Sequence, residues 1–240
     1  KLMKKNVILL TTKTPHHFFF INQISKFCNL LIVFEKKVLK PNFKTNHNYE
    51  KHQVLYEKKK WFNNKKIKIF KDFKMLNVDN INEKKSINFI KSNASDLILS
   101  FGISRLKKDF LKKIKKKIYN FHGGDTSRYR GLDSHLWSLY HNDLRGLKVT
   151  LHEVDDKLDT GNVVYVEKLQ LKKTNKLHQL RSINTELCIK LAKKLLNKKK
   201  IKTKKQNKIG RYYSFMPTDI KNLINKKYKK KLKKIYSDSK

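Results

Sequence analysis

Short apolar runs alternate with longer amphipathic stretches at the start of the chain. Residues 6–10 (NVILL) and 30–34 (LLIVF) are continuous apolar runs, a pattern typical of strands buried on both faces. Between them, apolar residues recur at helical spacing over 17–27. A strand, a helix and a second strand in this order predict a parallel sheet with helices packed on it.

The same alternation returns further along the chain. The pattern predicts strands over 96–101, 118–121, 149–154 and 163–168, and helices over 106–117, 132–140 and 177–196, with Thr174 as the cap of the last helix. Between 36 and 91 the pattern is poorer and indicates only a helix over 47–62 and a strand near 67–70. We therefore expect one α/β domain over 3–200, with helices on both faces of a mostly parallel sheet. A short basic extension over 201–240 should follow, in which 210–217 (GRYYSFMP) packs on the rest of the protein.

The charge changes this interpretation little. The chain has 59 Lys and Arg against 19 Asp and Glu, which gives a formal net charge of +40. A basic cluster would suggest a polyanionic partner, because Lys and Arg release counterions from phosphates. Here the lysines are spread along almost the whole chain and mixed with Asn and Ile, as an AT-rich coding bias would produce. Binding of nucleic acid therefore stays open but is not favoured.

The cysteines and the apolar runs bear on the compartment. Cys28 and Cys188 are far apart in sequence, form no metal-like pair, and lie among apolar neighbours. Buried free thiols fit a reducing cytoplasm. No apolar run approaches 18 residues, and residues 1–17 lack the features of a secretory signal. We expect a cytoplasmic protein with no metal and no membrane segment.

One stretch differs in composition from the rest. Residues 120–164 contain five of the seven glycines and seven of the nineteen acidic residues, but only five Lys or Arg. Glycine permits positive φ and close approach of the backbone, and loops that need both usually handle a ligand. The composition therefore indicates a functional site in this stretch.

Three residues of this stretch carry suitable chemistry. Asn120 and His122 alternate at the end of a predicted strand, so their side chains should point to the same side. An amide N–H and an imidazole could together stabilise an oxyanion that forms on an attacked carbonyl, and Asp159 could steer protons. The alternative is a hydrogen-bonded structural pair and an aspartate that forms a turn. From the residues alone, both interpretations stay open.

The stretches NFHGGDTSRYRGLDSHLWSLYHND (120–143) and VTLHEVDDKLDTGNVV (149–164) resemble the folate-dependent formyltransferases, and DLILSFGISRL (96–106) fits the folate-side loop of that family. The family includes glycinamide ribonucleotide formyltransferase and the catalytic domain of methionyl-tRNA formyltransferase. The resemblance implies a Rossmann-like formyltransferase fold, 10-formyltetrahydrofolate as formyl donor and a primary amine as acceptor. It also implies catalytic roles for Asn120, His122 and Asp159.

The resemblance extends to the binding residues. It implies a folate pocket formed by Phe101, Gly102, Ile103, Leu106, Val154, Asp155 and Asp156. If the acceptor is a small amine, Arg128, Arg130, Asp133 and His135 would line or support its side of the site; the alternative is a solvated helix cap at Asp133 and surface arginines. His16 and His17 either face the same cleft or are structural. We interpret His141 and His152 as structural.

The acceptor is less constrained than the donor. The loop after the first strand, TTKTPHH, lacks the glycines with which glycinamide ribonucleotide enzymes hold phosphate, and little resembling the C-terminal β-domain of methionyl-tRNA enzymes follows the long helix. The sequence pattern GGD-x-x-x-YRGLDSHLW resembles that of enzymes that formylate nucleotide-linked amino sugars. The alternatives are the other two formyltransferases of the family or a non-catalytic RNA-binding protein on the same fold. A homodimer also stays open.

Overall fold

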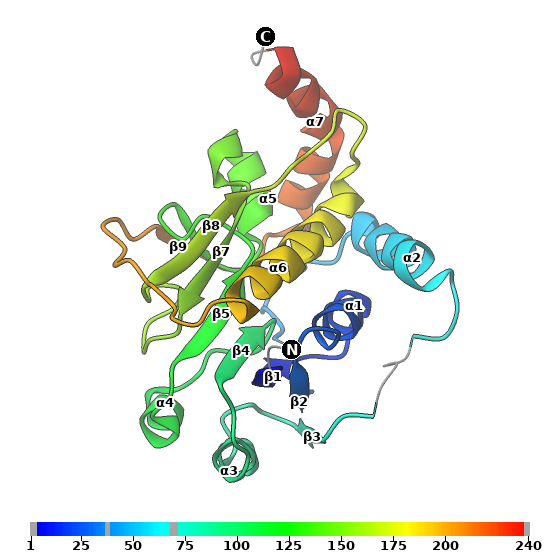
Figure 1. The fold of residues 1–240 in the computed structure, drawn as a ribbon. Helices are drawn as coiled ribbons and strands as arrows, with labels where there is room; N and C mark the ends of the chain where they lie inside the picture. The colour runs from blue at the N-terminus through cyan, green and yellow to red at the C-terminus, as the bar shows by residue number, and fades with distance from the viewer. Residues whose placement is uncertain (1–3, 37–38, 68–71, 238–240) are drawn as a thin grey trace.

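The computed structural model of the chain describes residues 4–36, 39–67 and 72–237. A seven-stranded sheet runs through the molecule, with strand order β3-β2-β1-β4-β5-β7-β8 (Figure 1). Its first five strands are parallel, whereas β7 runs antiparallel to β5, and β8 antiparallel to β7. The strands are β1 (Asn6–Thr11), β2 (Asn29–Glu35), β3 (Met75–Val78), β4 (Leu97–Phe101), β5 (Ile118–His122), β7 (Lys148–Glu153) and β8 (Val163–Lys168). This arrangement confirms the predicted fold class.

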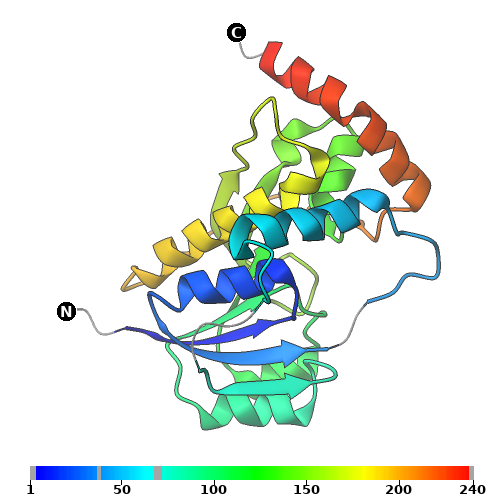
Figure 2. The ribbon, with the colours of Figure 1, turned by 90° about the vertical axis from the view of Figure 1, so that its right-hand side faces the viewer.

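Helices cover both faces of the sheet (Figure 2). One face carries α1 (Pro15–Ile24) and α6 (Leu180–Leu196), with α2 (Asn48–Phe62) packed beside α1. The other face carries α3 (Lys84–Ser92) and α4 (Lys108–Ile114). The remaining helices are α5 (Ser134–Tyr140), α7 (Thr218–Ser237) and two single turns of 3₁₀ helix, η1 (Leu144–Gly146) and η2 (Leu177–Gln179).

The alternation of side chains along β1 explains these two layers. Val7 and Leu9 point to the core beneath α1 and α6, whereas Ile8 and Leu10 point to the core beneath α3 and α4. All four side chains are fully buried. A strand that is covered on both faces needs apolar residues at every position, which is why this strand is a continuous apolar run in the sequence.

Several predicted boundaries were wrong. The helix predicted over 17–27 runs from Pro15 to Ile24. It begins at Pro15 because proline is favoured in the first helical turn, where its missing N–H is not needed. The helix predicted over 177–196 begins with the 3₁₀ turn η2 and continues as α6. Lys176 is the residue immediately before η2, so Thr174 does not cap this helix. The helix predicted to extend to 117 ends at Ile114, where Lys115 takes a left-handed conformation.

The weakly patterned region differs most from the prediction. Helix α2 agrees with the predicted 47–62, and His47 caps it by accepting a hydrogen bond from the Tyr49 N–H. The strand predicted near 67–70 falls largely outside the described residues, and β3 lies further along the chain. Helix α3 was not predicted, because only a few of its residues are buried and most of the rest are polar.

The segment after α6 packs on the main domain. Strand β9 (Arg211–Tyr213) pairs in parallel with β6 (Tyr129–Gly131), and α7 packs against α5. Met216 and Ile224 from this segment are buried in the same core as α1 and α6. The packing of 210–217 is thus as predicted, while the boundary between a domain over 3–200 and an extension stays a prediction. No helix in the described part of the chain is long and apolar enough to cross a membrane.

Candidate active site

A cavity of about 790 Å³ opens where β4 and β5 end. Because the carboxyl ends of parallel strands share one edge of the sheet, the loops after these strands meet there. Ten of the residues predicted for the site line this cavity: Phe101, Gly102, Ile103, Leu106, Asn120, His122, Arg130, Val154, Asp155 and Asp159. Residues separated by almost sixty positions in sequence thus form one wall.

Asp159 lies between two histidines in this wall. Its Oδ2 atom is 3.4 Å from Nδ1 of His122, and its Oδ1 atom is 3.3 Å from Nε2 of His152. The backbone N–H of Gly131 donates a hydrogen bond to Oδ2 at 2.9 Å. All three side chains are buried. The carboxylate is therefore held from several directions in a part of the protein that excludes most water.

The far nitrogen of each histidine faces a backbone carbonyl. His122 Nε2 lies 2.9 Å from the carbonyl oxygen of Tyr129, and His152 Nδ1 lies 2.7 Å from that of Glu153. A carbonyl only accepts, so each of these nitrogens carries a proton. The other nitrogen of each ring is directed at the Asp159 carboxylate.

Opposing effects act on the carboxyl group of Asp159. Burial alone would raise the pKa of Asp159, because it penalises the charged form. The charge of His122, the contacts of His152 and the Gly131 N–H act in the other direction and outweigh burial. The pKa of Asp159 consequently lies well below the usual range of a carboxyl group. Asp159 is ionised throughout the physiological range.

Asn120 presents an amide to the same cavity. The hydroxyl of Ser100 donates to Oδ1 of Asn120 at 2.9 Å, which leaves Nδ2 directed at Nε2 of His152, 3.3 Å away. Ser100 and Asn120 are paired neighbours on β4 and β5. The sheet register therefore determines which end of the amide faces the reaction space.

His152 is a site residue that the sequence interpretation missed. The sequence interpretation took it as structural, but it contacts both Asn120 and Asp159. The antiparallel register of β5 and β7 places His152 directly opposite Asn120. Its alternation with Thr150 on the same strand was the available signal, but only the pairing of the two strands brings His152 to the site.

The loop after β4 lies against α1. A Cβ atom on Gly102 would lie 2.3 Å from Nε2 of His17, and Gly102 has a φ of +75°, so this position requires glycine. His16 and His17 both line the cavity. Burial, followed by the charge of Arg181, lowers the pKa of His17 to about 3. His17 is thus neutral, and its buried Nε2 has no hydrogen-bond partner among the described residues.

A second cavity of about 530 Å³ adjoins the first. His122, Gly123, Gly131 and Leu132 line both cavities, so the site lies at their junction. The outer wall of the second cavity comes from α2 and from the start of α6. Its polar lining includes Tyr49, Arg181 and Asn184. The side-chain amide oxygen of Asn184, Oδ1, is buried and has no partner among the described residues.

The residues predicted for the acceptor side are divided among several locations. Asp133 and His135 line the second cavity, whereas Arg130 lines the first. His135 Nε2 donates to the carbonyl oxygen of Lys148, and burial lowers the pKa of His135 to about 4. Asp133 accepts from the Met216 N–H at 2.8 Å. Both side chains are thus already occupied by protein groups.

Two of the predicted binding residues lie outside both cavities. Arg128 forms an ion pair of 2.8 Å with Asp143. Asp156 is exposed, and its backbone carbonyl accepts from the guanidinium of Arg105. In the described part of the chain, no group of three or more His, Cys, Asp and Glu side chains has an arrangement that could hold a metal ion.

A family model described as formyl transferase matches residues 30–188. The chain belongs to this family. The matched residues include β4, β5, β7, the loops that form the site and most of α6. The segment that carries β9 and α7 lies outside the matched range.

Curated relatives of this formyl transferase family member are similar over part of its length. It is 33% identical over 112 residues to the bifunctional polymyxin resistance protein ArnA of Wigglesworthia glossinidia brevipalpis, which covers 45% of this chain and 16% of that protein. It is 30% identical over 138 residues to methionyl-tRNA formyltransferase of Prochlorococcus marinus, which covers 54% of this chain and 42% of that protein. The chain thus spans less than half the length of both relatives.

Solved structures share the fold at low sequence identity. A sugar N-formyltransferase from Shewanella has a TM-score of 0.57 and 13% identity, with 89% of this chain and 77% of that chain covered. The formyltransferase PseJ from Anoxybacillus kamchatkensis has a TM-score of 0.52 and 19% identity, with 87% of this chain and 85% of that chain covered. An N-formyltransferase from Helicobacter canadensis has a TM-score of 0.56 and 17% identity, with 88% of this chain and 71% of that chain covered.

Proposed function

We propose that the chain transfers a formyl group from 10-formyltetrahydrofolate to a primary amine on a nucleotide-linked amino sugar. The observation that carries the proposal is that Asn120, His122 and Asp159 converge in the first cavity, and that His122 also lines the second. One cavity can hold the formyl donor and the other the acceptor. The reacting carbon and nitrogen would then meet beside these three residues.

The three side chains suit attack of an amine on the formyl carbon. As the nitrogen bonds to the formyl carbon, negative charge develops on the formyl oxygen, and the Nδ2–H of Asn120 can donate to it. His122 lies next to this position with its Nδ1 atom 3.4 Å from the Asp159 carboxylate, which would stabilise positive charge on the imidazole during the reaction. Breakage of the bond between the formyl carbon and N10 then yields a formamide. The proton lost by the amine passes to N10 and gives tetrahydrofolate, with Asp159 and its histidines as the proton path.

The first cavity fits the formyl donor. Apolar side chains of Ile103, Leu106 and Val154 line it and suit the flat pterin ring. The neutral His17, whose Nε2 no described residue partners, offers a directional polar contact in the same cavity. We propose Phe101 and Asp155 as further donor contacts.

The second cavity suits an amino sugar. Its lining combines polar groups from α2 and α6 with the apolar side chains of Leu177 and Leu180. The buried side-chain oxygen Oδ1 of Asn184 can accept a hydrogen bond from a sugar hydroxyl. PseJ was crystallised with UDP-4,6-dideoxy-4-formamido-L-AltNAc and tetrahydrofolate, and the Helicobacter canadensis enzyme with folinic acid and dTDP-3-aminofucose. These ligands support a nucleotide-linked amino sugar as acceptor. We propose a cytoplasmic location, which fits the buried thiols of Cys28 and Cys188.

The test is incubation with 10-formyltetrahydrofolate and a panel of amines: UDP- and dTDP-linked amino sugars, glycinamide ribonucleotide and methionyl-tRNA. We expect tetrahydrofolate release with a nucleotide-linked amino sugar, and a loss of about 10²- to 10³-fold in kcat for Asn120→Ala. His122→Ala should lose activity as well. His52→Ala, at an exposed position on α2, is the matched control and should equal the parent. Release with methionyl-tRNA alone would overturn the sugar assignment, and no release with any amine would overturn the proposed activity.

A further inference from the structure

The backbone at Asp159 has an uncommon conformation. Its φ of +55° lies in the left-handed region, which residues other than glycine adopt at some cost in free energy. Two positions later, a Cβ on Gly161 would lie 1.9 Å from the carbonyl oxygen of Glu153, so the turn also packs closely against β7. Such a turn persists only where neighbouring groups hold it in position. The identity of those groups therefore bears on the orientation of the Asp159 carboxylate.

Gln206 holds this turn from outside the matched family region. Its Nε2 donates hydrogen bonds to the carbonyl oxygens of Asp159 and Gly161, at 3.1 and 2.8 Å. The amide thus bridges both ends of the turn that contains the left-handed residue. Nearby, Lys204 and Val163 exchange two backbone hydrogen bonds of 2.8 Å, which align the segment of Gln206 along the start of β8.

The same segment also supports the opposite side of the turn. Gly131, whose N–H donates to the Asp159 carboxylate, belongs to β6, and β6 is paired with β9. Arg130 on β6 donates from Nε to the carbonyl oxygen of Gly210 and from Nη1 to that of Leu158. Residues 204–213 therefore contact the aspartate turn directly through Gln206 and indirectly through β6.

We propose that Gln206 is a positioning residue, which holds the Asp159 turn so that its carboxylate stays between His122 and His152. The proposal rests on the proposed function, because it assigns Gln206 a part in orienting the same catalytic group. Gln206 lines neither cavity, so it acts through Asp159 and not through contact with a substrate.

The expected effect follows from the two hydrogen bonds. One neutral hydrogen bond shifts a population ratio by roughly fivefold, so loss of both lets the turn relax in a substantial fraction of molecules. In those molecules the carboxylate no longer faces the two imidazoles. The rate of the chemical step should fall, while binding of both substrates should be nearly unaffected.

The experiment measures kcat, KM and melting temperature for Gln206→Leu, Gln206→Glu and Gln206→Lys in the full chain. Leucine removes the donor at similar size, glutamate replaces it with acceptors, and lysine keeps a donor. We expect kcat to fall about tenfold for leucine and at least as much for glutamate, and to recover in part for lysine, with KM for each substrate within about twofold. Gln170→Leu, at an exposed position after β8, is the control and should match the parent.

The outcomes separate positioning from general stabilisation. If Gln206→Leu melts at a lower temperature but keeps the kcat of the parent per folded molecule, the proposal is overturned. A raised KM with unchanged kcat also overturns it, because it would indicate a substrate contact. If Gln206→Leu does not fold, the comparison of the glutamate and lysine variants decides between the two roles. Failure of the proposed function is distinct, since the parent itself would then release no tetrahydrofolate.

Discussion

Asp159 concentrates the electrostatics of the site in one residue. It has a left-handed backbone, and its carboxylate faces the imidazoles of His122 and His152 in a buried setting. A carboxylate in this position favours positive charge on the imidazoles beside it, where the proposed catalysis requires stabilisation of an oxyanion. The same contacts make the residue relevant to stability, because they stabilise the charged form more in the folded protein than in the unfolded chain.

We predict that Asp159→Asn destabilises the protein in a pH-dependent way. The pKa of Asp159 is lower in the folded chain than its value of about 3.9 in an unfolded chain, so the contribution is complete well above that value. It is lost as the pH falls below about 5 toward the folded-state pKa. The difference in free energy of unfolding between parent and variant should be on the order of 2 kcal/mol at pH 7 and should shrink steadily below pH 5. Urea denaturation at several pH values measures it.

Asp79→Asn provides the control for this measurement. The Asp79 side chain is 84% exposed and pairs only loosely with Lys36, so its replacement should have almost no effect at any of these pH values. A difference between parent and Asp159→Asn that stays constant from pH 7 to pH 4 would contradict the assignment of a depressed pKa to Asp159.

At the scale of elements, the C-terminal segment completes the domain. Strand β9 pairs with β6 beside the site, and α7 packs against α5. The link between α7 and the domain includes Lys221, which is only 2% exposed. Its ammonium group donates to Glu50 and to the carbonyl oxygen of Thr45, and it lies 3.6 Å from Asp133. One buried cation therefore joins α7 to the start of α2 and to the N-terminus of α5.

We predict that Lys221→Ala costs about 3 kcal/mol of unfolding free energy. The substitution removes a buried side chain and leaves the partly buried carboxylates of Glu50 and Asp133 without their shared cation. Lys226→Ala, at an exposed position on the same helix, should change stability by less than about 0.5 kcal/mol. Urea denaturation of both variants is the measurement. Equal effects of the two substitutions would show that Lys221 does not anchor α7.

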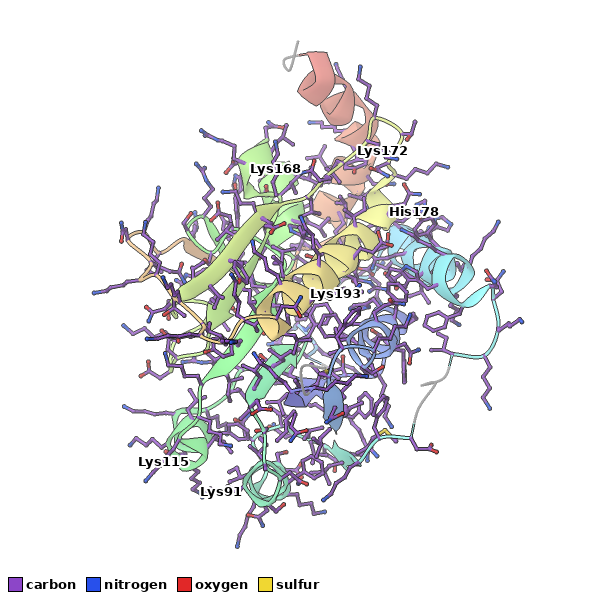
Figure 3. The ribbon with its side chains drawn as sticks, in the orientation of Figure 1. Lys91, Lys115, Lys168, Lys172, His178 and Lys193 are labelled. Atoms are coloured by element: carbon purple, nitrogen blue, oxygen red, sulfur yellow. The ribbon has the colours of Figure 1, made fainter. Side chains whose placement is uncertain are left out.

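At the scale of the whole molecule, the dominant property is the net charge of +40. Lysines extend in several directions from different elements, as the labelled Lys91, Lys115, Lys168 and Lys193 illustrate (Figure 3). Such a surface repels itself, and this repulsion opposes the compact state. The lysines are spread over different elements and do not gather at the proposed site. This spread agrees with the interpretation of the charge as a property of the whole sequence.

We predict that salt stabilises the protein. Raising NaCl from 50 to 300 mM shortens the range of charge repulsion and should raise the melting temperature by several degrees. Differential scanning calorimetry at both concentrations measures the shift. KCl should give the same result, because the effect comes from screening and not from a specific ion. A lower melting temperature at higher salt would indicate that attractive ion pairs dominate over the net repulsion.

The sequence predicted the site better where chemistry and glycine coincide. Asn120, His122 and Asp159 stood out because they lie in a stretch poor in lysine and rich in glycine, and they do meet at one cavity. Of the residues predicted for the acceptor side, Arg128 pairs with Asp143 away from both cavities, and its role stays a prediction. Spacing along a loop does not determine which way a long charged side chain turns.

What the sequence by itself determined is the alternation of buried strands and helices, because a strand covered on both faces must be apolar at every position, as β1 is. It also determined the family, through residues that recur in a defined order. Only the tertiary structure decided that His152 faces Asn120 and that Gln206 holds the Asp159 turn. Both depend on strand register and on contacts between distant segments, and the local pattern of apolar and polar residues carries no information about either.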